Sequence, residues 1–340
     1  PSLDATLSLG EGSTPLLRLD RLARRLGLPA LYAKNEAMNP TQSFKDRGTA
    51  VAVQNARRLG FTRIGTVSTG NMAASTAAYG ARAGLATFVL LKEGTPAENI
   101  RMAGIHRPRL VVVEGDYGRL FAESFRLGRR RNILFMNSVD PFRIEGYKLI
   151  AFETFLQLGG SVPDLCLVPL SSGGHLLGLL KAFRELRDGG FTDRLPVVVG
   201  VQAEGCAPLA RAFAAGSARY EVFEHPGTIA HAISNPSPPA GNLVLAMMRE
   251  SGGLILSVGD EEMLEAQGHL AAEGLFCQPD SATTLAALLK LARRADPALS
   301  GTASAVLVLT GSGLKNLKAL DAAALPLRRA ALEDLERVLD

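Results

Sequence analysis

Residues 39–48 read NPTQSFKDRG and lie between a short apolar piece and a helical pattern. The apolar piece at 31–34 is expected to form a strand, and apolar residues at three- and four-residue steps from 50 to 59 predict a helix. The Asn-Pro pair indicates a loop, and Thr41 or Ser43 is expected to cap the helix. This pattern predicts that the lysine of the segment lies near the start of a helix.

That lysine, Lys45, is predicted to have an unusual environment. The amino end of a helix carries positive partial charge, which together with burial lowers the pKa of a lysine and favours its neutral amine. A neutral amine can attack an aldehyde and form a Schiff base. The ordinary alternative is a surface lysine paired with Asp46, and an isolated lysine would favour that interpretation.

The composition is that of a globular protein. The chain has 340 residues, 47% of them hydrophobic, which suits two domains or one large one. No apolar run approaches the roughly 18 residues of a membrane span. The first residues include Asp4 and Glu11 and lack a basic-then-apolar signal, so we expect a cytoplasmic protein without a membrane partner.

Cysteines and charges argue against metal and nucleic-acid sites. Cys166, Cys206 and Cys277 are far apart and are expected to be reduced, buried packing residues. The net charge is +4, and the densest basic run, residues 126–131, is expected to be a solvated helix end. Because no nucleic-acid motif accompanies it, we expect neither a metal nor a nucleic acid as partner.

Strand-like and helical patterns alternate after the lysine segment. Strands are expected at 64–67, 86–91, 110–113, 133–136, 165–168, 197–201, 254–258 and 305–309. Such alternation predicts an α/β fold with two domains, each a mostly parallel twisted sheet flanked by helices. We expect a small domain at 55–143, and a large domain built from 1–54 and 144–340. The polar, Pro-rich stretch 216–241 is a candidate lid.

Ligand-binding loops lie at the carboxyl ends of parallel strands, and several loops here have suitable residues. Residues 171–175, SSGGH, precede a helix, so their backbone N–H groups could surround an anion. Ser68 and Thr69 precede another helix and suit a carboxylate. Arg143 offers planar donors for an oxyanion, although a salt bridge to Glu145 or Asp140 is the ordinary alternative. Each loop taken alone could be a plain structural turn.

Taken together, these strings resemble the fold-type-II pyridoxal-phosphate (PLP) enzymes of the tryptophan synthase β-like superfamily. The core SFKDRG at 43–48 and the opening EGSTPL at 11–16 are most similar to the threonine synthase family. The resemblance implies PLP as cofactor, held by Lys45 as a Schiff base, and an amino acid as substrate. It also implies a homodimer.

The resemblance further implies individual roles. Asn71 would hydrogen-bond the 3′-oxygen of PLP, and Thr310 would meet the pyridine nitrogen, which favours elimination and replacement chemistry. Substrate would be bound by Ser68 and Thr69 at its carboxylate, and by Asn137 and Arg143 at its phosphate. The complete cofactor set would be Lys45, Phe44, Asn71, Ser171, Ser172, Gly173, Gly174, His175 and Thr310.

The chain departs from the family pattern at several positions. Met72 and Ser172 stand where a Thr and an Asn commonly help to hold the substrate phosphate. In the string around 274–282, Gln278 replaces a Glu and Asp280 replaces an Ala, while Ser281 is expected to cap a helix.

The resemblance nevertheless predicts a lyase that converts O-phospho-L-homoserine and water to L-threonine and phosphate. The first alternative is β-elimination or β-replacement on serine, threonine or a phosphorylated β-hydroxy amino acid. A remote alternative is a non-catalytic ligand-binding protein on the same fold.

Overall fold

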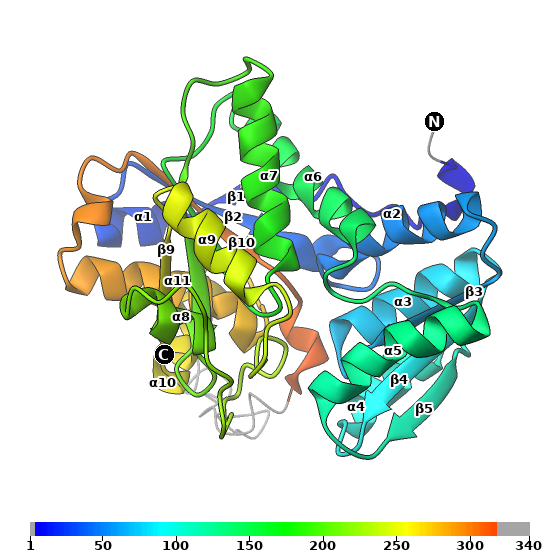
Figure 1. The fold of residues 1–340 in the computed structure, drawn as a ribbon. Helices are drawn as coiled ribbons and strands as arrows, with labels where there is room; N and C mark the ends of the chain where they lie inside the picture. Colours follow the sequence, from blue (N-terminus) through cyan, green and yellow to red (C-terminus); the bar gives the residue numbers. More distant parts are fainter. Residues whose placement is uncertain (1–3, 318–340) are drawn as a thin grey trace, which may run out of the picture.

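The computed structural model describes residues 4–317, which form two sheets that lie side by side (Figure 1). The first is six-stranded, in the order β1-β2-β10-β7-β8-β9. Its strands are β1 (Leu16–Arg18), β2 (Ala30–Asn35), β7 (Leu165–Pro169), β8 (Val197–Ala203), β9 (Leu254–Val258) and β10 (Ser304–Leu309). All neighbouring strands are parallel except the antiparallel pair β1 and β2.

The second sheet is four-stranded and wholly parallel, in the order β5-β4-β3-β6. Its strands are β3 (Arg63–Val67), β4 (Ala86–Lys92), β5 (Arg109–Val113) and β6 (Leu134–Phe135). The predicted fold class, α/β with two mostly parallel sheets, is confirmed. These strands all fall inside the predicted small domain, but the domain limits themselves remain a prediction. The outermost residues of the predicted large domain, 1–3 and 318–340, lie outside the described residues.

Helices connect the strands and cover the sheets (Figure 1). The α-helices are α1 (Asp20–Leu26), α2 (Lys45–Arg58), α3 (Asn71–Arg82), α4 (Ala97–Gly104), α5 (Tyr117–Arg131), α6 (Pro141–Gln157), α7 (Gly174–Asp188), α8 (Pro208–Ala214), α9 (Gly241–Glu250), α10 (Asp260–Ala272) and α11 (Pro279–Arg293). Short 3-10 helices occupy Ala5–Leu7, Glu36–Met38, Pro297–Leu299 and Gly313–Lys315. The predicted lid stretch has no helix or strand between α8 and α9.

Strand β7 shows why helices cover both faces of the large sheet. Leu165 and Leu167 pack into the core formed with α1, α10 and α11, whereas Cys166 and Val168 pack into the core formed with α6, α7 and α9. Successive side chains of a strand point to opposite faces, so a strand that is apolar throughout must be covered on both.

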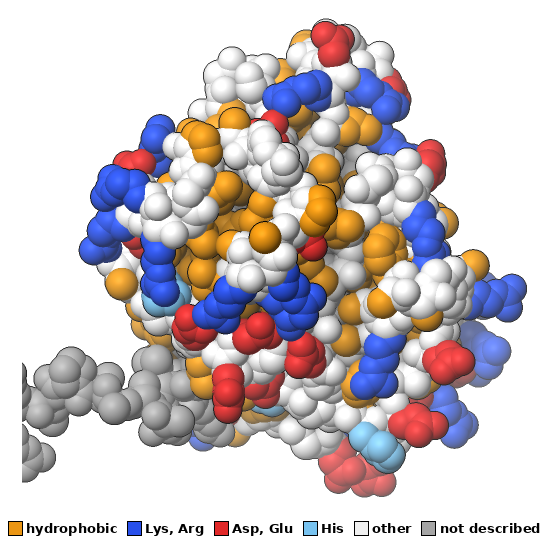
Figure 2. Space-filling model, turned by 90° about the vertical axis from the view of Figure 1, so that its left-hand side faces the viewer, with side chains coloured by type: hydrophobic (Ala, Val, Ile, Leu, Met, Phe, Trp, Pro, Cys, Tyr) orange, Lys and Arg blue, Asp and Glu red, His pale blue; other side chains and the backbone are white. Residues whose placement is uncertain are grey.

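The remaining sequence expectations concern cysteines, charge and membranes. The three cysteines are unpaired and buried, as predicted. The basic run lies at the exposed end of α5. Figure 2 shows one face on which Lys and Arg side chains are interspersed with Asp and Glu side chains around a central area of hydrophobic side chains. Within residues 4–317, no helix combines the length and the apolar character that crossing a membrane requires.

Candidate cofactor and active site

Helix α2 begins at Lys45, as predicted, but the expected cap is wrong. The residue before the helix is Phe44, which makes no side-chain cap. Thr41 instead donates both its backbone N–H and its hydroxyl to the carboxylate of Asp46, each over 2.6 Å. The hydroxyl of Ser43 is buried and has no hydrogen-bond partner within residues 4–317.

Lys45 is not the surface lysine of the ordinary alternative. Asp46 is buried and bound to Thr41, and Lys45 makes no ion pair with any described residue. Its Nζ lies 4.3 Å from the ring centre of Phe44. Desolvation by the surrounding protein, and then the charge of Arg143, lowers the pKa of Lys45 to about 7. A large fraction of the amine is therefore neutral at neutral pH.

The ring of Phe44 contacts both the Lys45 amine and the ring of a histidine. The ring of His175 stacks on Phe44 at 4.1 Å between centres, with 26° between the planes. His175 is the second residue of α7, and both its ring nitrogens are buried without a hydrogen-bond partner among the described residues. Burial, followed by the charge of Lys45, holds the pKa of His175 well below its usual range, so the ring is neutral.

The loop before α7 is shaped for an anion. Gly173 has a φ of +97°, a left-handed conformation that side chains rarely adopt. A Cβ on Gly174 would lie 2.3 Å from the carbonyl oxygen of Ser138, so the backbone approaches too closely for any other residue. The first N–H groups of a helix have no partner in that helix and attract negative charge. The loop therefore suits a phosphate.

The structure brings the predicted cofactor residues together. One pocket, at the carboxyl ends of the large sheet's strands, is lined by Phe44, Lys45, Asn71, Ser171, Ser172, Gly173, Gly174, His175 and Thr310. Asp280, which was not predicted for the site, also lines it, and burial raises the pKa of Asp280 to about 6. The roles of these residues toward a cofactor remain predictions, but their common location supports them.

Two polar contacts orient side chains of this pocket. Asn71, the first residue of α3, donates from Nδ2 to Oε1 of Gln278 over 2.8 Å, and so joins the two sheets' loops. Ser281 lies inside α11 and is not its cap, so that prediction is wrong. Its hydroxyl instead lies 3.0 Å from that of Thr310 and accepts the N–H of Gly311 over 3.0 Å.

Of the predicted substrate residues, Ser68 and Thr69 lie in the loop before α3, as expected. The hydroxyl of Ser68 accepts the N–H of Gly70 over 3.3 Å. Asn137 is buried; it accepts the N–H of Val67 and donates to Ser124, each over 2.9 Å. None of the three residues lines the pocket described above. Their contact with substrate therefore remains a prediction.

Arg143 is fully buried and joins three helices. It donates over 2.7 Å each to the carbonyl of Met136 and to the hydroxyls of Thr49 and Thr76. The salt bridge considered as its ordinary alternative is not formed. Asp140 accepts backbone N–H groups at the start of α6, and Glu145 pairs with two lysines, Lys148 and Lys181.

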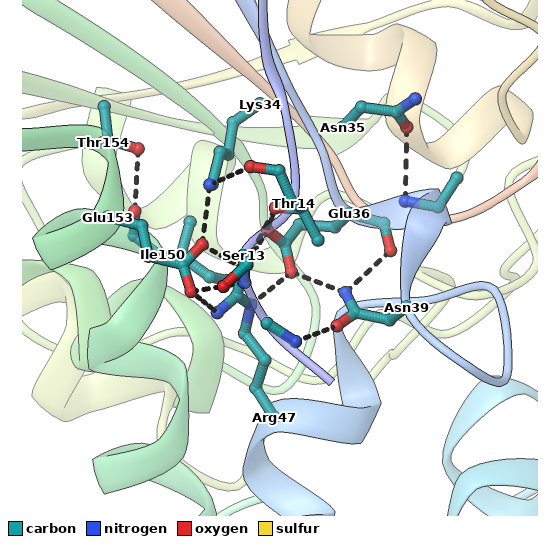
Figure 3. A network of polar contacts seen from close by, with 12 residues as sticks. Ser13, Thr14, Lys34, Asn35, Glu36, Asn39, Arg47, Ile150, Glu153 and Thr154 are labelled. Atoms are coloured by element: carbon teal, nitrogen blue, oxygen red, sulfur yellow. Dashed lines mark hydrogen bonds and ion pairs between the residues drawn. The ribbon is translucent and has the colours of Figure 1, made fainter. Parts of the chain in front are cut away.

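A buried ionic network holds the beginning of α2 (Figure 3). Arg47 donates to both carboxylate oxygens of Glu36 and to both of Glu153, over 2.6 to 2.9 Å. Lys34 donates to Glu153 over 2.8 Å. These partners were missed by sequence reasoning, because no spacing or motif connects residues so far apart in the chain.

Comparison with known proteins identifies the family. Residues 7–311 match the family model described as pyridoxal-phosphate dependent enzyme. The threonine synthase of Methanosarcina acetivorans is 41% identical over 287 residues, which cover 84% of this chain and 71% of the relative. The threonine synthase of Methanocaldococcus jannaschii is 40% identical over 312 residues, which cover 91% and 76%. The chain belongs to the threonine synthase family of PLP-dependent enzymes.

A solved structure agrees with this family's fold. Maize serine racemase superposes with a TM-score of 0.77 at 17% identity, covering 96% of this chain and 91% of that one. At this identity the likeness concerns the fold alone.

The pocket of this threonine synthase family member fits PLP. Lys45 offers an amine that is partly neutral at neutral pH for the aldehyde, and the loop 171–175 offers backbone donors for the phosphate. The buried ring nitrogens of His175, which lines the pocket, have no hydrogen-bond partner among the described residues and could be satisfied by a bound polar ligand. Sequence and structure therefore agree on the cofactor.

Proposed function

We propose that this PLP-dependent enzyme is a threonine synthase that converts O-phospho-L-homoserine and water to L-threonine and phosphate. The relatives named threonine synthase are 40% and 41% identical and support this substrate. The observation that carries the proposal is the position of Lys45. Its amine, with a pKa of about 7, lies in the same pocket as the anion-binding loop.

Lys45 is the candidate catalytic residue. PLP, when bound, supplies the electron sink that stabilises negative charge at Cα of the substrate. A general base works best when its pKa lies near the operating pH, and the pKa of Lys45 meets that condition. We propose that Lys45 accepts the Cα proton and that Ser68 and Thr69 hold the substrate carboxylate.

We keep Asn137 and Arg143 as candidates for the substrate phosphate. Arg143 uses three of its N–H groups on Met136, Thr49 and Thr76, and a guanidinium has five. Its remaining donors and its charge favour an anionic leaving group nearby. Binding the phosphate directly would require local movement, because the side chain of Arg143 is fully buried.

The test is to mix the PLP-loaded protein with O-phospho-L-homoserine and to measure phosphate and amino-acid product together. Equal amounts of phosphate and threonine are expected, and Lys45→Ala should abolish both. If protein with normal cofactor absorbance releases no phosphate, the proposed substrate is wrong while the cofactor assignment stands. Protein without any lysine-bound aldehyde would favour the remote, non-catalytic alternative.

The second candidate is β-elimination or β-replacement on serine, threonine or a phosphorylated β-hydroxy amino acid. It is favoured by Met72 and Ser172, which differ from the family pattern, and by Asn137, whose amide oxygen and nitrogen each make an internal hydrogen bond. Product analysis separates the candidates, because β-elimination of serine yields pyruvate and β-elimination of threonine yields 2-oxobutanoate.

The remaining expectations stay predictions. A homodimer is testable by light scattering, and a cytoplasmic location by fractionation. For metals, a search of residues 4–317 finds no cluster of at least three His, Cys, Asp or Glu residues suited to hold an ion.

A further inference from the structure

The segment 228–237 belongs to no helix or strand, and its middle part forms a wall of the cofactor pocket. Ala232 and Ile233 line the pocket directly. An irregular segment has backbone N–H groups that no sheet or helix satisfies, so other groups must accept them. The position of this wall therefore depends on which groups accept hydrogen bonds from its N–H groups.

Asp280 provides one of these acceptors. Its side chain is 2% exposed, and its Oδ1 accepts the N–H of Ala232 over 2.8 Å. The next N–H of the segment, that of Ile233, donates to the carbonyl of Ala230 over 3.1 Å, so the contact with Asp280 is made at Ala232. A buried carboxylate is costly unless it is hydrogen-bonded, and here the pocket wall supplies a donor, the N–H of Ala232.

Three residues after Ala232, the same segment contacts the anion-binding loop. Asn235 donates from Nδ2 to the hydroxyl of Ser172 over 3.0 Å, and its Oδ1 accepts the N–H of Ser237 over 3.2 Å. Ser172 lines the cofactor pocket. Because Ala232 and Asn235 are close in sequence, anchoring the first restricts where the amide of the second can lie.

We propose that Asp280 is a positioning residue that anchors the 232–235 segment as a wall of the cofactor pocket and keeps Asn235 against Ser172. The carboxylate acts through the segment and need not touch the substrate. The proposal rests on the PLP-binding role of the pocket and is independent of which amino acid the enzyme uses.

The test compares Asp280→Ala with Asp280→Asn in the full chain. Hydrogen exchange of the PLP-loaded protein and titration of cofactor-free protein with PLP give two readouts that need no turnover. Because a hydrogen bond to a charged group is lost, Asp280→Ala should speed exchange at residues 232–235 by about tenfold or more and weaken PLP binding. Asp280→Asn keeps an acceptor oxygen of the same shape and should stay closer to wild type.

Asp260 offers a matched control on the same segment. It accepts the hydroxyl of Thr228 over 2.6 Å and the N–H of Ile229 over 3.1 Å, and it does not line the pocket. Asp260→Ala should speed exchange at 228–230 while leaving PLP affinity unchanged.

The proposal is overturned if Asp280→Ala leaves exchange at 232–235 and PLP affinity as in wild type. It is also overturned if Asp260→Ala weakens PLP as much as Asp280→Ala does. Should Asp280→Ala fail to fold, Asp280→Asn and Asp280→Ser decide, because Ser is too short to reach the N–H of Ala232. The proposal is supported if Asp280→Ser weakens PLP binding and speeds exchange at 232–235 while Asp280→Asn does neither. It is contradicted if the two variants have the same PLP affinity and the same exchange rates.

Discussion

Nη1 of Arg47 lies 2.6 Å from Oε1 of Glu153, a residue 106 positions further along the chain. The same guanidinium pairs with Glu36, and the side chains of Arg47 and Glu36 are both fully buried. Arg47 follows Lys45 by two residues in α2, so this network fixes the first turn of the helix that carries the catalytic candidate. Its four charged groups, those of Lys34, Glu36, Arg47 and Glu153, are balanced in sign.

Arg47→Ala is expected to destabilise the protein strongly. Removing one partner of a buried ion pair leaves uncompensated charge and costs about 3–5 kcal/mol. The free energy of unfolding in denaturant is the measurement. Arg18→Ala is the control, because Arg18 and Asp20 form a pair with side chains 53% and 55% exposed, and solvent screens such pairs so that they contribute little. If both variants lowered the free energy of unfolding by the same amount, burial of the ion pair would not be the cause of the loss.

Acid stability should depend on Glu153. Burial alone would raise its pKa, but hydrogen bonds and charge from Arg47, with Lys34, lower it from 4.5 to about 2. Because the pKa is lower in the folded state, Glu153 adds stability that is fully present above about pH 4.5 and is lost as the pH falls toward 2. Glu153→Gln should flatten the fall in unfolding free energy over that range. A slope unchanged by the variant would refute this assignment.

The pH dependence of cofactor capture should report on Lys45. Its pKa of about 7 predicts that the rate at which cofactor-free protein captures PLP rises with pH to a midpoint near 7, well below the 10.5 of an ordinary lysine. Since the charge of Arg143 is the second cause of the shift, Arg143→Gln should move the midpoint upward. The prediction is wrong if the wild-type capture rate has its midpoint near pH 10. Absorbance of the bound cofactor is the readout.

Gly174→Ala should disable the anion-binding loop. The added methyl would lie 2.3 Å from the backbone oxygen of Ser138, so the loop must shift, and PLP affinity should fall at least tenfold. Gly268→Ala in α10 is the control, because nothing lies within 4 Å of its added methyl. Because alanine favours a helix more than glycine does, this change should stabilise the folded protein by up to about 1 kcal/mol and leave PLP affinity unchanged. Titration with PLP distinguishes the outcomes.

The sequence alone determined the fold class and the helix start at Lys45, whereas the set of residues expected around the cofactor came from the resemblance to PLP enzymes. The fold class and the helix start follow from local patterns, namely apolar periodicity and the alternation of strands and helices. Ser172 and Thr310 follow strands of the large sheet, so their meeting at its carboxyl edge was predictable, but Asn71 follows a strand of the small sheet and reaches the pocket through the packing of the two sheets' elements.

Only the tertiary structure showed where the polar side chains find their partners. The cap assigned to Thr41 fails because Asp46 takes its hydroxyl, and Ser281 binds Thr310 where a cap was expected. The contact of Asp280 with Ala232 depends on how α11 packs beneath a segment 48 positions away. Side-chain hydrogen bonds act over about 3 Å, so their partners are set by packing between distant elements, which no periodicity or spacing in the sequence records.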